Sequence, residues 1–245
     1  MRKLLFASAV SAAIFLPLTA TAQTALAAAP ASPHTFTGNV GLFSQYIFRG
    51  LTETNEKPAL QGGFDYSHSS GFYLGTWASN ISWFTEQNVG TLAAPVSLGS
   101  PGFGGNTKSN TASLEWDFYG GYKGTFGGGD WNYDVGLLQY YYPGTYENLG
   151  NLFSKPNTLE GYGLIGWKWI TLKYSQATGD TFGVKNSKGS NYLDLSAAVP
   201  LGESGFNLGL HYGTQKYKGT SPVFAGTSLT NNLFTYSDWK VGAST

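Results

Sequence analysis

Cysteine is absent from this 245-residue chain, and charged residues make up only 11% of it. Without cysteine, neither disulfides nor a thiolate metal site can stabilise the fold. A soluble domain carries about a quarter of its residues as Asp, Glu, Lys and Arg, so the scarcity of charge predicts a surface that does not face water everywhere. The formal net charge is zero and there is no basic cluster, which argues against nucleic-acid binding.

Long hydrophobic runs are also missing beyond the N-terminus. No stretch there approaches the roughly 18 apolar residues of a membrane-spanning helix. Yet 41% of the residues are hydrophobic and 16% are aromatic. The apolar residues come one in two, so the pattern favours strands with one apolar face over buried helices.

The first residues form a separate unit. Two basic residues precede an apolar run over residues 4–18, and Ala20-Thr21-Ala22 is a small-residue cleavage site. This pattern is typical of a secretory signal peptide, which we assign to residues 1–22. Residues 23–36 contain two prolines and are predicted to be a flexible lead-in. The remaining residues, 37–245, are predicted to be a single barrel domain.

Strict alternation marks the strands. Residues 114–119 read Leu-Glu-Trp-Asp-Phe-Tyr, which puts apolar side chains on one side and acidic ones on the other. We expect Leu114, Trp116 and Phe118 to face outward. The same alternation predicts ten strands, at residues 37–49, 59–68, 71–83, 111–122, 131–142, 158–167, 169–176, 190–199, 206–215 and 234–242.

The links between these strands alternate between short and long. Turns of a few residues at 69–70, near 168 and at 200–205 are separated by longer links such as 84–110, 143–157 and 177–189. Outer-membrane barrels sort their connections in this way, with short periplasmic turns and longer external loops. We therefore predict an all-β, antiparallel, transmembrane up-and-down β-barrel of about ten strands. A soluble β-sandwich is the alternative, and solubility without detergent would identify it.

Several blocks resemble a known family. The run Gly-Asn-Val-Gly-Leu-Phe-Ser-Gln-Tyr-Ile-Phe-Arg-Gly at residues 38–50, together with residues 57–66, 71–83 and 236–242, resembles the TorF family of proposed porins, also described as bacterial proteins of unknown function (Gcw_chp). The resemblance implies an outer-membrane location and a transport role, with no established catalytic residues. Such proteins continue further and close with a terminal aromatic residue, so we expect about twelve strands in a longer complete protein.

Candidate site residues follow from the polar side of the alternation. As lumen-facing groups they would set the local field for solutes, as charged rings do in pores; mutual salt bridges inside a filled barrel are the alternative. The candidates for the lumen are Gln45, Arg49, Asp65, Glu115, Asp117, Asp134 and His211. Aromatic residues near strand ends are candidates for the girdles at the two membrane interfaces: Trp83, Trp131, Tyr141, Trp167 and Trp169.

Catalysis and cofactors have little support. The chain has three histidines and no paired His pattern that would bind a metal. His211 lies inside a predicted strand on its polar side, where a hydrogen-bonded lumen histidine is the favoured interpretation and a barrel enzyme the weaker one. We predict no cofactor and no enzyme activity.

Size predicts a narrow pore. About eight strands leave an interior that side chains fill, and sixteen to eighteen leave a channel; ten or twelve fall between. The sequence therefore predicts a narrow porin for small solutes. Residues 84–110 are the candidate for folding inward, and a mobile external loop is the favoured alternative for this segment. A non-conducting structural or loop-interaction barrel is the alternative. The expected partners are outer-membrane lipid, small solutes and the barrel-assembly machinery; the oligomeric state is left open.

Overall fold

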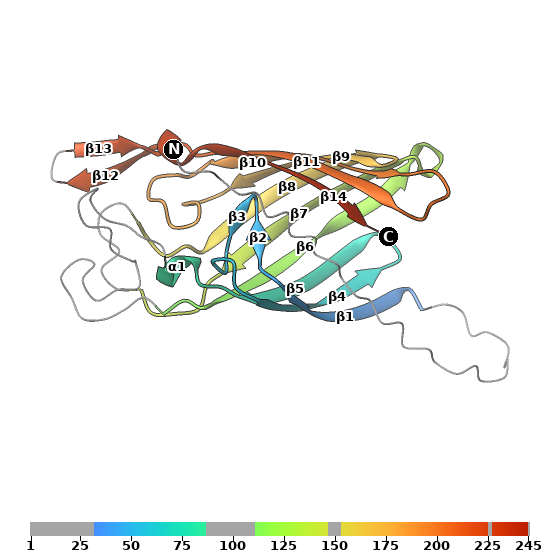
Figure 1. Cartoon of the computed structure of the whole chain (residues 1–245), viewed down its shortest axis with the longest axis horizontal. Coiled ribbons are helices and arrows are strands. Elements are labelled where there is room, and N and C mark those ends of the chain that lie inside the picture. The colour runs from blue at the N-terminus through green and yellow to red at the C-terminus, as the bar shows by residue number, and fades with distance from the viewer. Residues whose placement is uncertain (1–31, 87–110, 147–152, 225–226, 245) are drawn as a thin grey trace.

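Ten antiparallel strands form one continuous sheet in the computed structural model, which describes residues 32–86, 111–146, 153–224 and 227–244 (Figure 1). Each strand pairs with the next one along the chain in the order β1-β4-β5-β6-β7-β8-β9-β10-β11-β14. The strands are β1 (His34–Phe43), β4 (Ala59–His68), β5 (Phe72–Asn80), β6 (Leu114–Phe126), β7 (Trp131–Tyr141), β8 (Thr158–Trp167), β9 (Ile170–Ala177), β10 (Asn191–Pro200), β11 (Asn207–Lys216) and β14 (Tyr236–Ser244).

Smaller elements lie in the links between these strands. Two short hairpins are formed by β2 (Ile47–Phe48) with β3 (Leu51–Thr52), and by β12 (Thr220–Phe224) with β13 (Thr227–Thr230). The helical turns are α1 (Trp83–Glu86), η2 (Gly127–Gly129) and η3 (Asn231–Phe234). Over the described ranges, no helix has both the length and the apolar character needed to cross a membrane.

The links sort by length, as predicted. Because neighbouring strands are antiparallel, successive links fall at opposite ends of the sheet. Residues 69–71, 127–130, 168–169 and 201–206 form the short-link end, whereas the long-link end holds 44–58, 81–113, 142–157, 178–190 and 217–235. In Figure 1 the short links lie at the right, and α1 and the β12–β13 hairpin, which belong to long links, lie at the left.

The two faces of the sheet differ in polarity. We call the face that carries Trp116 the outer face and the face that carries Glu115 the inner face. Large apolar side chains stand exposed on the outer face, for example Phe64 at 73% and Trp239 at 69%. Leu114, Trp116 and Phe118 are exposed there too, so they do not pack against a second sheet and the predicted outward direction is confirmed.

Charge is sorted just as strictly. Of the charged residues within the ten strands, Lys216 alone, at the end of β11, is on the outer parity. The strand residues on the inner parity are the acidic Asp65, Glu115, Asp117, Asp134, Glu160, Asp194 and Asp238 and the basic Lys123, Lys173 and Lys240. The sheet therefore reverses the polarity of a soluble protein.

The sheet curves around its inner face. The Tyr73 hydroxyl on β5 donates to Asp134 Oδ1 on β7 at 2.5 Å and also contacts the Tyr162 hydroxyl on β8. Neighbouring strands lie roughly 4.8 Å apart, so residues three strands apart meet over a strongly bent sheet. The ten antiparallel strands are confirmed, but the closed ring is not, because β1 and β14 are the two edges and do not pair within the described residues.

The first predicted strand, 37–49, is wrong in its extent. β1 begins at His34, inside the predicted lead-in, and ends at Phe43. Residues 44–58 then leave the sheet and fold back over its inner face. The reason is long-range: Tyr46 and Arg49 find their partners on distant strands, which local alternation cannot reveal. The predicted signal peptide and residues 87–110 of the predicted inward loop lie outside the described residues.

The predicted place of Trp83 is also wrong. β5 ends at Asn80, and Trp83 begins α1 instead of standing in an interface girdle. It packs against an apolar cluster of Ile81, Ala112, Tyr140 and Tyr142, with its ring 5.8 Å from that of Tyr142 and nearly perpendicular to it. Packing against these aromatic rings stabilises the Trp83 side chain more than an exposed position at the membrane interface would.

Candidate functional site

The segment of residues 44–58, here called the inserted hairpin, joins β1 to β4 across the inner face. Its short strands, β2 and β3, leave Arg49 and Gly50 as the two-residue turn. Both residues have positive φ, 46° and 80°, as a type I′ turn requires. A Cβ on Gly50 would lie 2.4 Å from Asp238 Cβ on β14, so only glycine fits where the tip meets the last strand.

Arg49 binds this turn to β8 and β11 through hydrogen bonds. Its Nη1 and Nη2 donate to Glu160 Oε1 and Oε2 on β8 at 3.0 and 2.7 Å, and Nη1 also donates to Gln215 Oε1 on β11 at 2.8 Å. The guanidinium carbon lies 4.8 Å from the Phe48 ring centre and 4.4 Å from that of Tyr192. The Arg49 and Glu160 side chains are 7% and 2% exposed. A paired, two-point contact of this kind is both strong and directional.

The other side of the hairpin meets an acidic pair on β6. The Tyr46 hydroxyl donates to Glu115 Oε1 at 2.9 Å, and Asp117 follows on the same face. Both carboxyl groups are buried. Glu115 Oε2 and Asp117 Oδ1 have no hydrogen-bond partner among the described residues. Burial raises the pKa of nearby Glu53 well above its ordinary value, and the charge of Glu115 adds to the rise.

Hydrogen bonds from tyrosine hold the acidic candidates nearer the middle of the sheet. The Tyr119 hydroxyl donates to Asp65 Oδ1 at 2.6 Å, and Tyr73 donates to Asp134 as described above. Both aspartates lie on the inner face, as predicted. Each phenol donor lies two strands away from its carboxyl group and links the two strands across the one between them. The network therefore fits the predicted alternative of mutual hydrogen bonds as well as a lumen lining.

His211 lies between two carboxyl groups. Its Nε2 is 2.8 Å from Asp238 Oδ1, and its Nδ1 is 3.3 Å from Asp194 Oδ2 and 3.1 Å from Ser196 Oγ. The Ser196 hydroxyl donates to Asp194 Oδ1 at 2.6 Å. A nucleophilic serine must donate to its base, so this arrangement suits a hydrogen-bonded histidine better than a catalytic one. Absence of enzyme activity stays a prediction.

The remaining aromatic candidates are exposed: Trp131, Tyr141 and Trp167 on the outer face, and Trp169 in the turn between β8 and β9. Trp131, Trp167 and Trp169 are exposed at the short-link end, where neighbouring ring centres lie 6.3 and 6.1 Å apart. Tyr141 is exposed at the opposite end of β7. These four positions agree with two aromatic bands. Gln45, a lumen candidate, is half-buried in the bend after β1 and lies in no strand.

Sequence reasoning missed four residues that the structure brings into this region: Tyr46, Glu53, Glu160 and Gln215. Glu160 and Gln215 lie on the polar parity of strands that were predicted at 158–167 and 206–215, so the parity rule could have found them. Tyr46 and Glu53 could not be found in that way, because they belong to the inserted hairpin.

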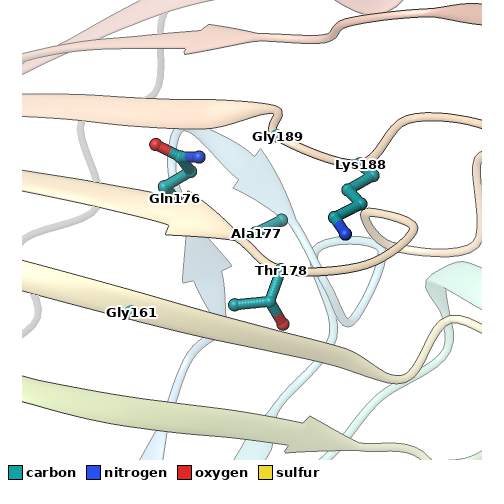
Figure 2. A pocket seen from close by; sticks show the side chains of 6 residues that line it. All are labelled: Gly161, Gln176, Ala177, Thr178, Lys188 and Gly189. Carbon is teal, nitrogen blue, oxygen red and sulfur yellow. The ribbon is translucent and has the colours of Figure 1, made fainter.

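A separate depression lies outside this region. Gly161, Gln176, Ala177, Thr178, Lys188 and Gly189 line a shallow pocket of about 400 Å³ where β8 and β9 meet the link 178–190 (Figure 2). Gly161 and Gln176 are on the outer parity, so the pocket opens away from the inner face. None of the candidate residues lines it.

Comparison with known proteins places the chain in a family without an assigned activity. Residues 27–245 match the family model described as "Bacterial protein of unknown function (Gcw_chp)". No curated protein and no solved structure shows significant similarity to the chain. The family description names no transport role, so the porin function and the TorF name stay predictions. The chain belongs to the Gcw_chp family of bacterial proteins of unknown function.

Proposed function

We propose that this protein is an outer-membrane β-barrel through which small solutes diffuse passively along the inner face. The observation that carries the proposal is the sorting of charge: inside the ten strands, every charged residue except Lys216 is on the inner parity. A membrane-spanning strand needs its charged side chains on the side away from lipid, because a charged side chain on the lipid side costs about 2–4 kcal/mol near the bilayer midplane.

The apolar outer face supports the same proposal. About half of each side chain is exposed for Val135, Leu137 and Leu195, at 51%, 57% and 49%. Fully burying one large apolar side chain is worth about 1.5–3 kcal/mol, so a whole face left in water would forgo a large stabilisation. Contact with lipid tails recovers it, and exposed tryptophans near the strand ends would sit at the headgroups.

Backbone pairing demands closure in this environment. Lipid cannot satisfy the free N–H and C=O groups of a sheet edge, so β1 and β14 must be covered if the sheet spans a membrane. We propose that the complete assembly pairs these edges, directly or through additional strands. The inner face then becomes a lumen.

The inserted hairpin would be the constriction of this lumen. It contacts β5 through Tyr46 and Trp77, whose ring centres lie 5.2 Å apart, and reaches β8 and β11 through Arg49. It therefore crosses the inner face near the long-link end. A non-conducting barrel is the second candidate, because the buried Arg49–Glu160 pair could hold the hairpin as a permanent plug.

Planar-bilayer recording separates these two candidates. Refolded protein should give discrete conductance steps, and a variant in which residues 46–54 are replaced by a short Gly-Ser link should give larger ones. If the parent protein is silent and the variant conducts, the hairpin is a plug and the second candidate holds. If both fold and neither conducts, the pore proposal is wrong.

A further inference from the structure

We propose that the solutes are small cations, and that Glu115 and Asp117 beneath the inserted hairpin form the site that selects them. The inference rests on the proposed pore, since selection requires a permeation path. It goes further by naming the charge of the permeant species and the residues that act on it.

The inner face has an excess of acidic groups although the chain as a whole is neutral. Seven acidic and three basic strand residues are on its parity, as named above. The inserted hairpin adds two of each sign: Glu53 and Arg49, whose side chains are buried, and the exposed Glu56 and Lys57. Charged groups that line a narrow passage set its ion preference, and a low-dielectric wall strengthens their field.

Arg49, the buried cation of the hairpin, already has directed partners. The hydrogen bonds of Arg49 Nη1 and Nη2 go to Glu160, Gln215 and Tyr140. Its guanidinium acts on Glu115 through space only. Arg49 therefore gives the acidic pair on β6 no hydrogen bond.

Two buried oxygens of the pair have no hydrogen-bond donor of their own. Tyr46 donates to Oε1 of Glu115, whereas Oε2 of Glu115 and Oδ1 of Asp117 are buried and lack a partner within the described ranges. Glu115 is 1% exposed and Asp117 is 7% exposed. Buried carboxyl oxygens need a hydrogen bond, a proton or a cation, and a path for ions brings a cation to them.

The arrangement fits a passing ion rather than a resident metal. Carboxylate and hydroxyl oxygens are ligands for alkali and alkaline-earth ions. However, the described part of the chain has no group of three or more His, Asp or Glu side chains placed to hold a metal. Two carboxylates beside the hairpin would hold a monovalent cation briefly and repel chloride.

The test is a reversal-potential measurement on the refolded full-length chain in a planar bilayer under a tenfold KCl gradient at pH 8. The permeability ratio of K⁺ to Cl⁻ should be on the order of threefold or more. Glu115→Gln with Asp117→Asn should lower this ratio to about one. Asp130→Asn, which removes an acidic group from an exposed short turn, is the matched control and should keep the ratio of the parent.

Each result has a separate meaning. Steps with no cation preference overturn this inference and leave the pore intact, while absence of any conductance removes the pore itself. An equal loss of preference in Asp130→Asn overturns the assignment to the β6 pair. If the double variant does not fold, as judged by heat-dependent gel mobility, Glu115→Gln alone must lower the ratio for the assignment to stand.

Discussion

Arg49 and Glu160 form a two-point ion pair that joins the tip of the inserted hairpin to β8, with Nη2–Oε2 at 2.7 Å. The two residues are 111 positions apart in sequence. Both are buried, so each depends on the other for its charge to be tolerated.

Removing Arg49 should therefore destabilise the fold markedly. Arg49→Ala leaves Glu160 buried without its partner, a loss of about 3–5 kcal/mol for a buried ion pair. Urea unfolding in detergent micelles, followed by tryptophan fluorescence, measures this change. Lys168→Ala is the control: Lys168 pairs with Asp130 at 4.0 Å on the surface, and its loss should cost less than about 1 kcal/mol. Equal effects of the two substitutions would contradict the role given to Arg49.

The hairpin turn should tolerate no side chain at Gly50. Gly50→Ala meets two obstacles, a φ of 80° and the Asp238 side chain, and strain in that backbone region alone costs about 1–3 kcal/mol. Gly202→Ala isolates the backbone part, because Gly202 has a φ of 61° and no atom within 4 Å of its added Cβ. The same unfolding assay should rank Gly50→Ala as the more damaging change; the reverse order would argue against contact between the hairpin and β14.

Stability should depend on pH through Glu53. Burial raises its pKa above the ordinary value, so the folded state binds the proton more tightly than the unfolded chain does. The stabilisation is complete below the unfolded pKa of about 4.3 and is lost as pH rises through the raised folded value.

Glu53→Gln should flatten this dependence and make the protein more stable than the parent at pH 8. The exposed Glu56→Gln, in the same hairpin, is the matched control. Unfolding free energies measured from pH 4 to pH 8 decide the matter. A parent whose stability rises with pH across this range by an amount that Glu53→Gln removes would contradict the assignment.

The strands could be predicted from the local sequence, whereas the contacts of the inserted hairpin could not. Alternation alone predicted β7 to within one residue and β8 at 158–167 in full, because each strand carries its own two-faced pattern. The inserted hairpin was missed, since residues 44–49 continue to look like a strand. Arg49 reaches Gln215, 166 positions away, and no local pattern contains such a contact. The Arg49-Gly50 dipeptide was the one local sign of a turn.

A charge on the outer face should prevent insertion. Val135→Arg places a cation in the middle of β7, where 51% of the side chain is exposed, at a cost of about 2–4 kcal/mol if lipid surrounds it. Leu201→Arg, in an exposed short link, should cost about 0–1 kcal/mol. Folding yield into liposomes compares the two. If water surrounded the outer face, both variants would fold equally well.

The absence of cysteine makes the central claim directly measurable, because single cysteines can be introduced and labelled with a fluorophore without side reactions. Labels at Val135→Cys and Leu195→Cys, on the outer face, should be quenched by lipids with brominated acyl chains. Labels at Asn132→Cys and Ser196→Cys, on the inner face, should not be. Outer-face labels that bromolipids leave unquenched, in protein that has folded, would contradict the placement of this face in the membrane.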